Sequence, residues 1–279
     1  MANCKYCGEP AGFLRRKHPA CEQAFQAGER QIATEMAAAA SSGGTIEGLP
    51  MRVASMALQA KVSEGRLREL VVAGWISAVD KFLEDGVLDE AEEQRLLKLQ
   101  DQFELTQTEL DTTGAVQKVA KAGVLRDVLS GVIPERINLQ GAIPFNLQRD
   151  EKVVWAFPNS KYLEEKTRKQ FVGGSRGVSV RIMKGVYYRV GDFKGQSIEH
   201  TERVHVDSGL VALTTKHIYF AGPSASLRIP YSKIVSFQPF SNGIGIVRDA
   251  RSAKPQLFET GDGWFAYNLA MNLSQLEAA

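Results

Sequence analysis

The sequence predicts a multidomain protein of the α+β class, and three patterns support that prediction. Cysteines and a histidine gather within the first 21 residues at a spacing typical of a metal site. Apolar residues then recur at helical intervals up to about residue 131, and beyond residue 136 they fall in short β-rich runs. We therefore expect a small metal-binding module with a following helix over 1–40, a helical bundle over 45–131, and an antiparallel β domain over 136–279.

The candidate metal ligands use every cysteine of the chain. Cys4, Cys7, His18 and Cys21 form the frame Cys-x2-Cys-x10-His-x2-Cys. Thiolates and a neutral imidazole are the ligands that Zn²⁺ prefers, and two close pairs can complete a tetrahedron with no position left for a substrate. We therefore predict one structural zinc ion. A disulfide with one thiol left over is the alternative, and an odd cysteine count without an apolar signal segment argues against it and favours a reducing cytoplasm.

A helix should follow the last two ligands. Pro19 suits the first turn of a helix, and residues 20–40 are rich in Ala, Glu and Gln. Together with the Cys-x2-Cys pair and the short connection that follows it, this arrangement resembles a treble-clef zinc finger over residues 1 to about 36. The resemblance implies a fold and a metal but no particular partner. Arg15-Arg16-Lys17 could face DNA or form a solvated turn, and we favour the turn because no wider basic face accompanies it.

The composition is that of an ordinary globular protein, with 44% hydrophobic residues, 24% charged residues and a net charge of +2. No run approaches the roughly 18 to 20 consecutive apolar residues that a membrane helix needs. The charge is unevenly distributed, because the charged residues of segment 84–111 are mostly acidic and those of segment 161–194 are mostly basic. These segments could attract one another or attract separate partners.

Helix signals dominate the region between residues 41 and 131. Ser-Ser-Gly-Gly at 41–44 predicts a helix end and a short flexible linker. Apolar residues from Leu67 to Phe82 then lie on one helical face, and a last helix should run from about 114 to 129. The predicted helix starts are an N-cap at Ser63 and capping-box pairs at Asp89 with Glu92 and at Thr106 with Glu109.

Residues 84–92 look like the second half of an EF-hand loop. Lys81 and Leu83, however, stand where the first and third oxygen ligands belong, so we predict no calcium site. The Asp-Gly turn between helices, with acidic residues opening the second helix, instead resembles the tellurite-resistance TerB-like helical bundle over roughly 60–130. No metal motif of that family matches residue by residue, so this resemblance implies a fold alone.

The sequence period changes near residue 131. Pro134 and Pro144 interrupt any helix, and short β-rich runs separated by turn residues predict an antiparallel sandwich or barrel. An amphipathic helix after Asp262-Gly263 could cover an open end. The predicted strands are 153–157, 178–182, 186–190, 204–206, 210–214, 217–220, 227–229, 234–237, 244–247 and 256–258.

Successive antiparallel strands closed by one C-terminal helix resemble a pleckstrin-homology (PH) domain. The runs 209–220 and 229–234 are similar to bacterial PH-like and GRAM-like modules, and the resemblance covers about 200–279. Residues 173–195 resemble an N-terminal extension of uncharacterised bacterial proteins. The resemblance implies binding of anionic lipid head groups, phosphopeptides or proteins. Because no dense basic cluster lies in a single early hairpin, we do not expect phosphoinositide binding.

Catalytic patterns are weak in this chain. His200, Glu202, His205 and Asp207 could form a metal or acid–base cluster, but on a strand His205 would point away from its apolar neighbours, as surface histidines commonly do. The glycine-rich run 173–177 lacks both the spacing of a phosphate-binding P-loop and a following helix. We therefore predict that the protein is not an enzyme.

These features together predict a non-enzymatic modular adaptor that contains zinc and binds protein partners in the bacterial cytoplasm. The partner-binding residues that we predict are Arg176, Arg181 and Lys184, because Arg181 would lie opposite the apolar residues of its strand. Two alternatives stay open. One is a nucleic-acid-binding protein of a phage-defence or stress system, which would use the zinc finger and the basic segment 161–194. The other is peripheral recruitment to an anionic membrane surface through the PH-like domain.

Overall fold

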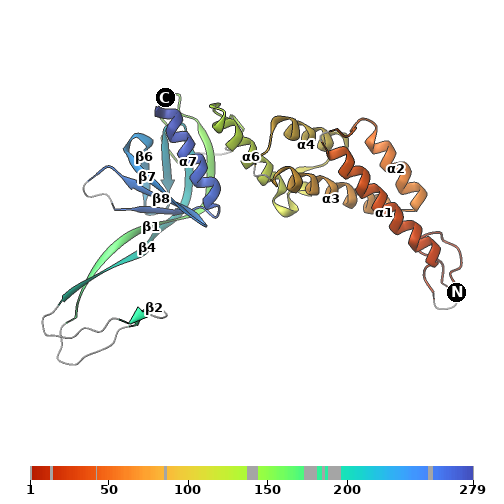
Figure 1. The fold of residues 1–279 in the computed structure, drawn as a ribbon, viewed down its shortest axis with the longest axis horizontal. Helices are drawn as coiled ribbons and strands as arrows, with labels where there is room; N and C mark the ends of the chain where they lie inside the picture. Colours follow the sequence, from red (N-terminus) through yellow and green to blue (C-terminus); the bar gives the residue numbers. More distant parts are fainter. Residues whose placement is uncertain are drawn as a thin grey trace. The chain divides into compact units, whose positions relative to one another are not determined.

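The fold is described by a computed structural model (Figure 1). The chain divides into two compact units, Met1–Arg136 and Ile137–Ala279. The first unit contains helices, and the second contains an antiparallel sheet with a C-terminal helix packed onto it, so the predicted α+β class is confirmed. The structure describes residues 2–12, 15–41, 43–84, 87–136, 144–172, 181–183, 186–187, 196–250 and 254–278.

The helices of the first unit begin largely where the sequence marks them. The Ser63 side chain accepts a hydrogen bond from the backbone N–H of Arg66. Asp89 with Glu92, and Thr106 with Glu109, form complete capping boxes, and these predictions are confirmed. Each cap stabilises its helix by about 1 kcal/mol. The elements are α1 (Pro19–Ala40), α2 (Leu49–Ala60), α3 (Glu64–Phe82), α4 (Glu90–Gln102), α5 (Gln107–Leu110), η1 (Asp111–Thr113) and α6 (Ala115–Leu129).

Helix α2 has no side-chain cap at its start, although Pro50 suits its first turn. The residues that flank it, Gly48 and Lys61, both have left-handed backbones, with φ of 67° and 59°, and neither caps the helix with a side chain. Its buried residues Leu49, Val53 and Ala57 join the core of the unit, and the helix packs against α1. Tertiary packing of an apolar face therefore stabilises α2, as it does most helices of this length.

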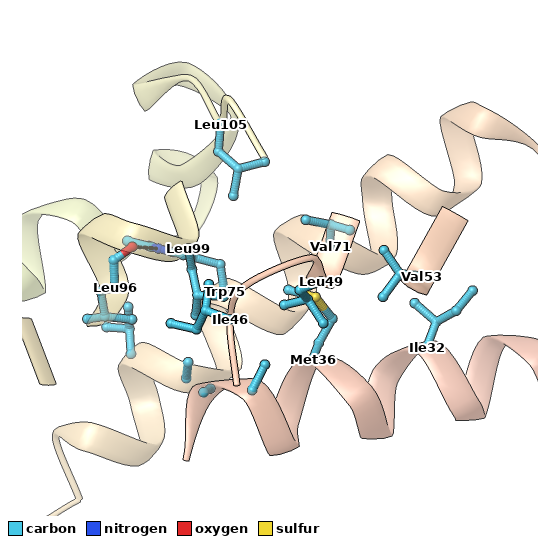
Figure 2. Packing of buried hydrophobic residues seen from close by; sticks show 14 of the residues in the cluster. Ile32, Met36, Ile46, Leu49, Val53, Val71, Trp75, Leu96, Leu99 and Leu105 are labelled. Carbon is cyan, nitrogen blue, oxygen red and sulfur yellow. Dashed lines mark hydrogen bonds between the residues drawn. The ribbon is translucent and has the colours of Figure 1, made fainter. Parts of the chain in front are cut away.

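One hydrophobic cluster holds the helices together. Figure 2 shows the side chains of Ile32 and Met36 pointing from α1 toward Leu49 and Val53 of α2. Trp75 of α3 is also buried there, and its indole N–H donates a hydrogen bond to the carbonyl of α4 residue Leu96 at 3.0 Å. Full burial of an aliphatic side chain such as that of Ile32, Leu49 or Val53 contributes roughly 1.5–3 kcal/mol to folding. Helix α1 therefore belongs to the helical core through its C-terminal half.

The segment after α1 is a packed turn. The N–H of Gly44 donates to the carbonyl of Ser41, and the guanidinium of Arg95 donates to the carbonyls of Ala39 and Gly44. A Cβ at Gly44 would lie 1.9 Å from the carbonyl oxygen of Ala38, so only glycine fits. The flexible linker predicted at 41–44 is thus, over the described Ser41, Gly43 and Gly44, fixed to the end of the helix. The compact unit continues through this point to Arg136.

The second unit is a seven-stranded sheet in the order β6-β5-β4-β1-β9-β8-β7, in which every neighbouring pair is antiparallel. A separate two-stranded sheet contains β2 and β3. The elements are β1 (Val153–Val172), β2 (Arg181–Met183), β3 (Val186–Tyr187), β4 (Gln196–Thr214), β5 (His217–Ala221), β6 (Ser226–Pro230), η2 (Tyr231–Lys233), β7 (Ile234–Phe240), β8 (Gly243–Arg248), β9 (Gln256–Glu259) and α7 (Gly263–Ala278).

Aromatic side chains fill the sheet interior. Tyr162 of β1 stacks on Phe258 of β9, with ring centroids 5.3 Å apart. Phe265 of α7 packs edge-on against Trp155 at 5.0 Å and also contacts Phe157. Such aromatic pairs add about 0.5–1.5 kcal/mol each to the burial itself. Helix α7 therefore covers the sheet through its buried face, as its amphipathic sequence predicted.

One predicted interruption of the sheet does not exist. The strands predicted at 204–206 and 210–214 form a single strand, β4. Asp207, although it is a common turn residue, accepts a hydrogen bond from the N–H of Ser224 at 2.7 Å. Gly209 lies so close to β5 that a Cβ would stand 2.0 Å from a backbone oxygen of that strand. Asp207 and Gly209 contact the β5–β6 hairpin instead of forming a turn, so the strand continues through them.

Strands β1 and β4 extend well beyond the rest of the sheet. The first strand was predicted at 153–157 but runs to Val172, and its pairing with β9 ends at Glu164. From there onward β1 pairs only with β4, from Glu165 opposite Arg203 to Val172 opposite Gln196. Figure 1 shows this two-stranded ribbon projecting from the sheet. We call residues 165–172 together with 196–203 the arm.

Candidate metal centre

Cys4, Cys7, His18 and Cys21 lie together at the start of the chain. Their ligand atoms are all within 4.8 Å of one another. The Nδ1 atom of His18 is 3.4 Å from Cys7 Sγ and 3.7 Å from Cys21 Sγ. A tetrahedron with zinc–sulfur bonds of about 2.3 Å and a zinc–nitrogen bond of about 2.0 Å has edges of about 3.5–3.8 Å. The spacing of these atoms therefore suits one tetrahedral metal ion.

The backbone arranges this group through a tight knuckle and a helix start. The N–H of Gly8 donates to the carbonyl of Cys4 at 2.9 Å, and Gly8 has a φ of 77°, which favours glycine. The N–H of Lys5 donates to the carbonyl of Arg16 at 2.9 Å, which joins the knuckle to the segment before α1. His18 is the N-cap residue of α1, with Pro19 at its first position. The predicted helix start thus supplies the second pair of ligands.

The hydrogen bonds of His18 select the nitrogen that can bind a metal. Its Nε2 atom lies 3.1 Å from the carbonyl oxygen of Pro10. A carbonyl only accepts hydrogen bonds, so Nε2 carries the proton and Nδ1, which faces Cys7 and Cys21, keeps its lone pair. Metal-binding histidines usually donate their other N–H in this way.

Backbone amides and neighbouring thiols shift the pKa values of Cys4 and Cys21 in opposite directions. Burial raises the pKa of the Cys4 thiol, but hydrogen bonds from the amides of Cys7, Tyr6 and His18 outweigh it and lower the pKa to about 6. Burial and the neighbouring Cys7 thiol raise the pKa of Cys21. A cation at the centre would favour the thiolate form of every cysteine, because ligand thiols bind metals deprotonated.

The basic tripeptide before His18 makes contacts within the module. The carbonyl of Arg16 accepts the hydrogen bond from Lys5, and the Lys17 ammonium pairs with Glu22 in the first turn of α1. Such exposed pairs contribute about 0–1 kcal/mol. These contacts agree with the interpretation of the tripeptide as a solvated turn.

The residues 200–207 that the sequence analysis considered as a catalytic cluster, and set aside, do not assemble into one among the described side chains. His205 is exposed, and its Nε2 atom lies 2.9 Å from the hydroxyl of Ser208. Asp207 accepts hydrogen bonds from the backbone N–H groups of Ser224, Ser208 and Ala225, which lower its pKa. Asp207 is thereby used to hold a loop. Within the described part of the chain, the group at Cys4 is the only set of three or more such ligands close enough for a metal.

The acidic residues that open α4 are engaged in structure. Glu92 closes the capping box, and the buried Glu93 pairs with the guanidinium groups of Arg126 and Arg136. Asp127 completes the network by pairing with both arginines. These contacts occupy the carboxylates of Glu92, Glu93 and Asp127.

The sequence analysis missed a buried polar network in the second unit. The side chain of Glu151 is fully buried and accepts hydrogen bonds from Thr214, from Tyr219 at 2.9 Å and from the N–H of Gln148 at 2.7 Å. His217 Nδ1 lies 2.8 Å from the same carboxylate. Burial raises the pKa of Glu151, but these hydrogen bonds prevail and lower it. The side chains that bind Glu151 come from residues more than 60 positions away, so no local pattern signals the network.

The predicted partner-binding residues are only partly within the described structure. Arg181 lies in β2, where its backbone stands opposite Tyr187 of β3, whereas Arg176 and Lys184 lie outside the described residues. In the arm, Lys166 stands opposite Glu202, Lys169 opposite Glu199, and Arg203 opposite Glu165. The Arg203 and Glu165 side chains are 3.7 Å apart. Three of the four Lys and Arg positions in the described part of the arm therefore stand opposite an acidic position.

No family model, no curated protein and no solved structure matches the chain. No helix in the described residues is long and apolar enough to cross a membrane.

Proposed function

We propose that this chain is a non-enzymatic, zinc-containing modular adaptor that binds a protein partner in the bacterial cytoplasm through a PH-like β domain. The main support is the strand order of the second unit. Two antiparallel meanders, β1-β4-β5-β6 and β7-β8-β9, join through the β1–β9 pair, and the single helix α7 packs on the sheet. This arrangement agrees with the PH-like resemblance of residues 200–279, and modules of that kind serve binding rather than catalysis.

Zinc is the metal that best fits the ligands at the N-terminus. Cys4, Cys7, His18 and Cys21 supply three sulfurs and one nitrogen, the donor set of closed structural zinc sites. When bound, the ion would supply folding stability to the knuckle and to the start of α1. No position of a four-coordinate ion would remain for a substrate, so the site supports construction of the adaptor and not a reaction.

The strongest competing function is nucleic-acid binding. Residues 165–203 contain nine Lys or Arg and four Asp or Glu, which makes this segment more basic than the rest of the chain. In the described part of the arm, however, three of the four Lys and Arg positions stand opposite an acidic residue. A surface that neutralises phosphates needs unpaired cations, so we favour a protein partner for this face.

The test is charge reversal at the predicted partner-binding residues. The double variant Arg176→Glu and Arg181→Glu should lose a specific protein partner captured from the native host, with fold and zinc content unchanged. The matched control is Arg149→Glu with Lys233→Glu, which reverses two exposed charges elsewhere in the same unit and should keep the partner.

A nucleic-acid titration on the purified chain decides between the two functions. We expect no submicromolar binding to duplex or single-stranded DNA or RNA at ~0.15 M salt. Tight binding with a steep negative salt slope, flattened by the Arg176→Glu and Arg181→Glu pair, would overturn the adaptor in favour of nucleic-acid recognition. Binding to anionic vesicles that survives the same salt would favour membrane recruitment instead.

A further inference from the structure

Strand β4 presents a long edge that no described strand covers. One side of β4 pairs with β1 along its length, from Gln196 to Thr214. The other side pairs with β5 only from Leu210 to Leu213, and the β5–β6 loop contacts Asp207 and Ser208. Between Gln196 and Val206 that second side has no strand partner among the described residues. Uncovered edges of this length pair readily with another strand, and a two-stranded ribbon by itself is only marginally stable in water.

The sequence of this edge is complementary to itself. In an antiparallel pair of two identical strands, residue i stands opposite residue j of the second copy when i and j lie equally far from the twofold axis. The midpoint of the edge from Gln196 to Val206 is Thr201. Pairing about Thr201 sets Glu199 opposite Arg203 of the second copy, and Ile198 opposite its Val204. Opposite-charge and aliphatic cross-strand pairs both stabilise a sheet.

The complementarity extends across four strands. Within one chain, Lys169 of β1 stands opposite Glu199 of β4, and Glu165 stands opposite Arg203. Pairing about Thr201 would therefore create a row of alternating charge, Lys169 and Glu199 of one copy followed by Arg203 and Glu165 of the other. The twofold axis repeats this row on the other side of Thr201. Four positions on the same face of the sheet thus alternate in sign from edge to edge.

The second arm edge lacks this property. On β1, a self-pairing centred on Thr167 sets Glu165 opposite Lys169 but also sets Lys166 opposite Arg168, and pairings centred on Arg168 or Lys169 set identical cations opposite each other. Like charges directly opposite destabilise a sheet. On β4, centres at Glu199, Glu202 or Arg203 are disfavoured for the same reason, so the register about Thr201 is selected by charge as well as by length.

We propose that a second copy of this chain pairs with this edge of β4, antiparallel and about a twofold axis at Thr201, to form a four-stranded sheet from two arms. The occupant is a second copy rather than another protein because residue identities on the edge complement themselves at one register. This inference goes beyond the adaptor function and does not rest on it, since it concerns the purified chain alone.

Charge variants test the register. We expect the wild-type chain to form a concentration-dependent dimer in sedimentation velocity, and Glu199→Lys or Arg203→Glu alone to weaken it about tenfold or more, because each places like charges opposite each other at both symmetry-related positions. Mixing the two single variants should restore the dimer as a heterodimer, because the interchain pairs then have opposite signs. Damage within the arm itself could not be repaired by mixing.

A cysteine variant provides an independent readout. Thr201→Cys places a thiol on the twofold axis and should yield a covalent dimer when oxidised glutathione is added to the zinc-loaded chain. Thr167→Cys is the matched control, because Thr167 stands opposite Thr201 within the chain, on the other strand of the arm, and should not cross-link. A chain that stays monomeric at all concentrations, a dimer that neither charge variant weakens, or failure of the mixture to recover would each overturn the proposal.

Discussion

Among the described residues, each unit of this protein buries one glutamate, and the two are stabilised in different ways. Glu93 of α4 is 6% exposed and pairs with the cations of Arg126 and Arg136. Glu151 is 7% exposed and is held by hydroxyl, imidazole and backbone donors. Charge is compensated in the helical unit, whereas hydrogen bonds solvate the carboxylate in the β unit. Burying a carboxylate without either provision would cost several kcal/mol.

The difference follows from how each unit is assembled. Glu93 joins α4 to α6 and to Arg136 beyond it, so its ion pairs fasten helices that otherwise meet through apolar side chains. Glu151 precedes β1 and joins its segment to the turn between β4 and β5, because Thr214 and His217 at the ends of that turn bind its carboxylate. The N–H of Gln148, in the segment before β1, is its backbone donor. The helical unit also has the Cys and His group at its N-terminal end, for which the β unit has no equivalent among its described residues.

The largest expected effect is on the metal centre. Cys7→Ser removes one of four ligands, so the purified variant should lose the single zinc ion per chain that metal analysis should find in the wild type. Residues 2 to about 28 should then lose protection from hydrogen exchange, while α1 from Ile32 onward stays protected by the helical core. Lys5→Ser, an exposed change in the same knuckle, is the control. Zinc absent from the wild type, or retained by a variant lacking Cys4 and Cys7, would refute the assignment.

Glu93→Gln tests charge compensation in the helical unit. The variant leaves Arg126 and Arg136 with Asp127 as their acidic partner, and we expect a loss of about 2–4 kcal/mol in the free energy of unfolding by urea denaturation. The control is Glu69→Gln, which removes a carboxylate from an exposed pair with Arg66 and should change stability by less than about 1 kcal/mol. Equal losses of stability in the two variants would show that the buried ion network contributes no more to folding than an exposed ion pair.

Gly28→Ala tests the packing of α1 on α2. A Cβ at Gly28 would lie 2.0 Å from the Cβ of Ala60, so the helices must separate, at a cost of about 1–3 kcal/mol. Gly65→Ala in α3 is the matched control, because open space surrounds that position and alanine should stabilise the helix by about 0.5–1 kcal/mol. Opposite signs for the two variants in thermal unfolding are the expected result, and a stabilising Gly28→Ala would contradict the close approach.

The last prediction concerns the pH dependence of stability at Glu151. Its pKa is lowered in the folded protein, so its contribution to stability is present above the ordinary carboxyl value of 4.5 and is lost as the pH falls through the lowered value. Glu151→Gln should therefore destabilise the β unit by about 1–3 kcal/mol at pH 7 and by less in acid. Urea midpoints at pH 7 and pH 4 measure this difference. A loss that is the same at both pH values would point to packing rather than charge.

The sequence by itself determined the features that depend on neighbours along the chain. Capping boxes at Asp89 and Thr106 involve residues three positions apart, and the ligand frame from Cys4 to Cys21 lies within a short segment, so both were predictable from local spacing. The α+β class and the closing helix α7 followed from the change in apolar period. These local signals predict the structure correctly because contacts with distant residues do not override them.

The tertiary structure alone decided what depends on distant partners. β4 continues through Asp207 and Gly209 because the β5–β6 hairpin supplies backbone contacts there, against the turn tendency of both residues. The pairing of Glu151 with His217, and the turn that joins α1 to Arg95, likewise link segments dozens of residues apart. Residue types set local preference, but the burial and hydrogen-bond partners that override it exist only once the chain has folded.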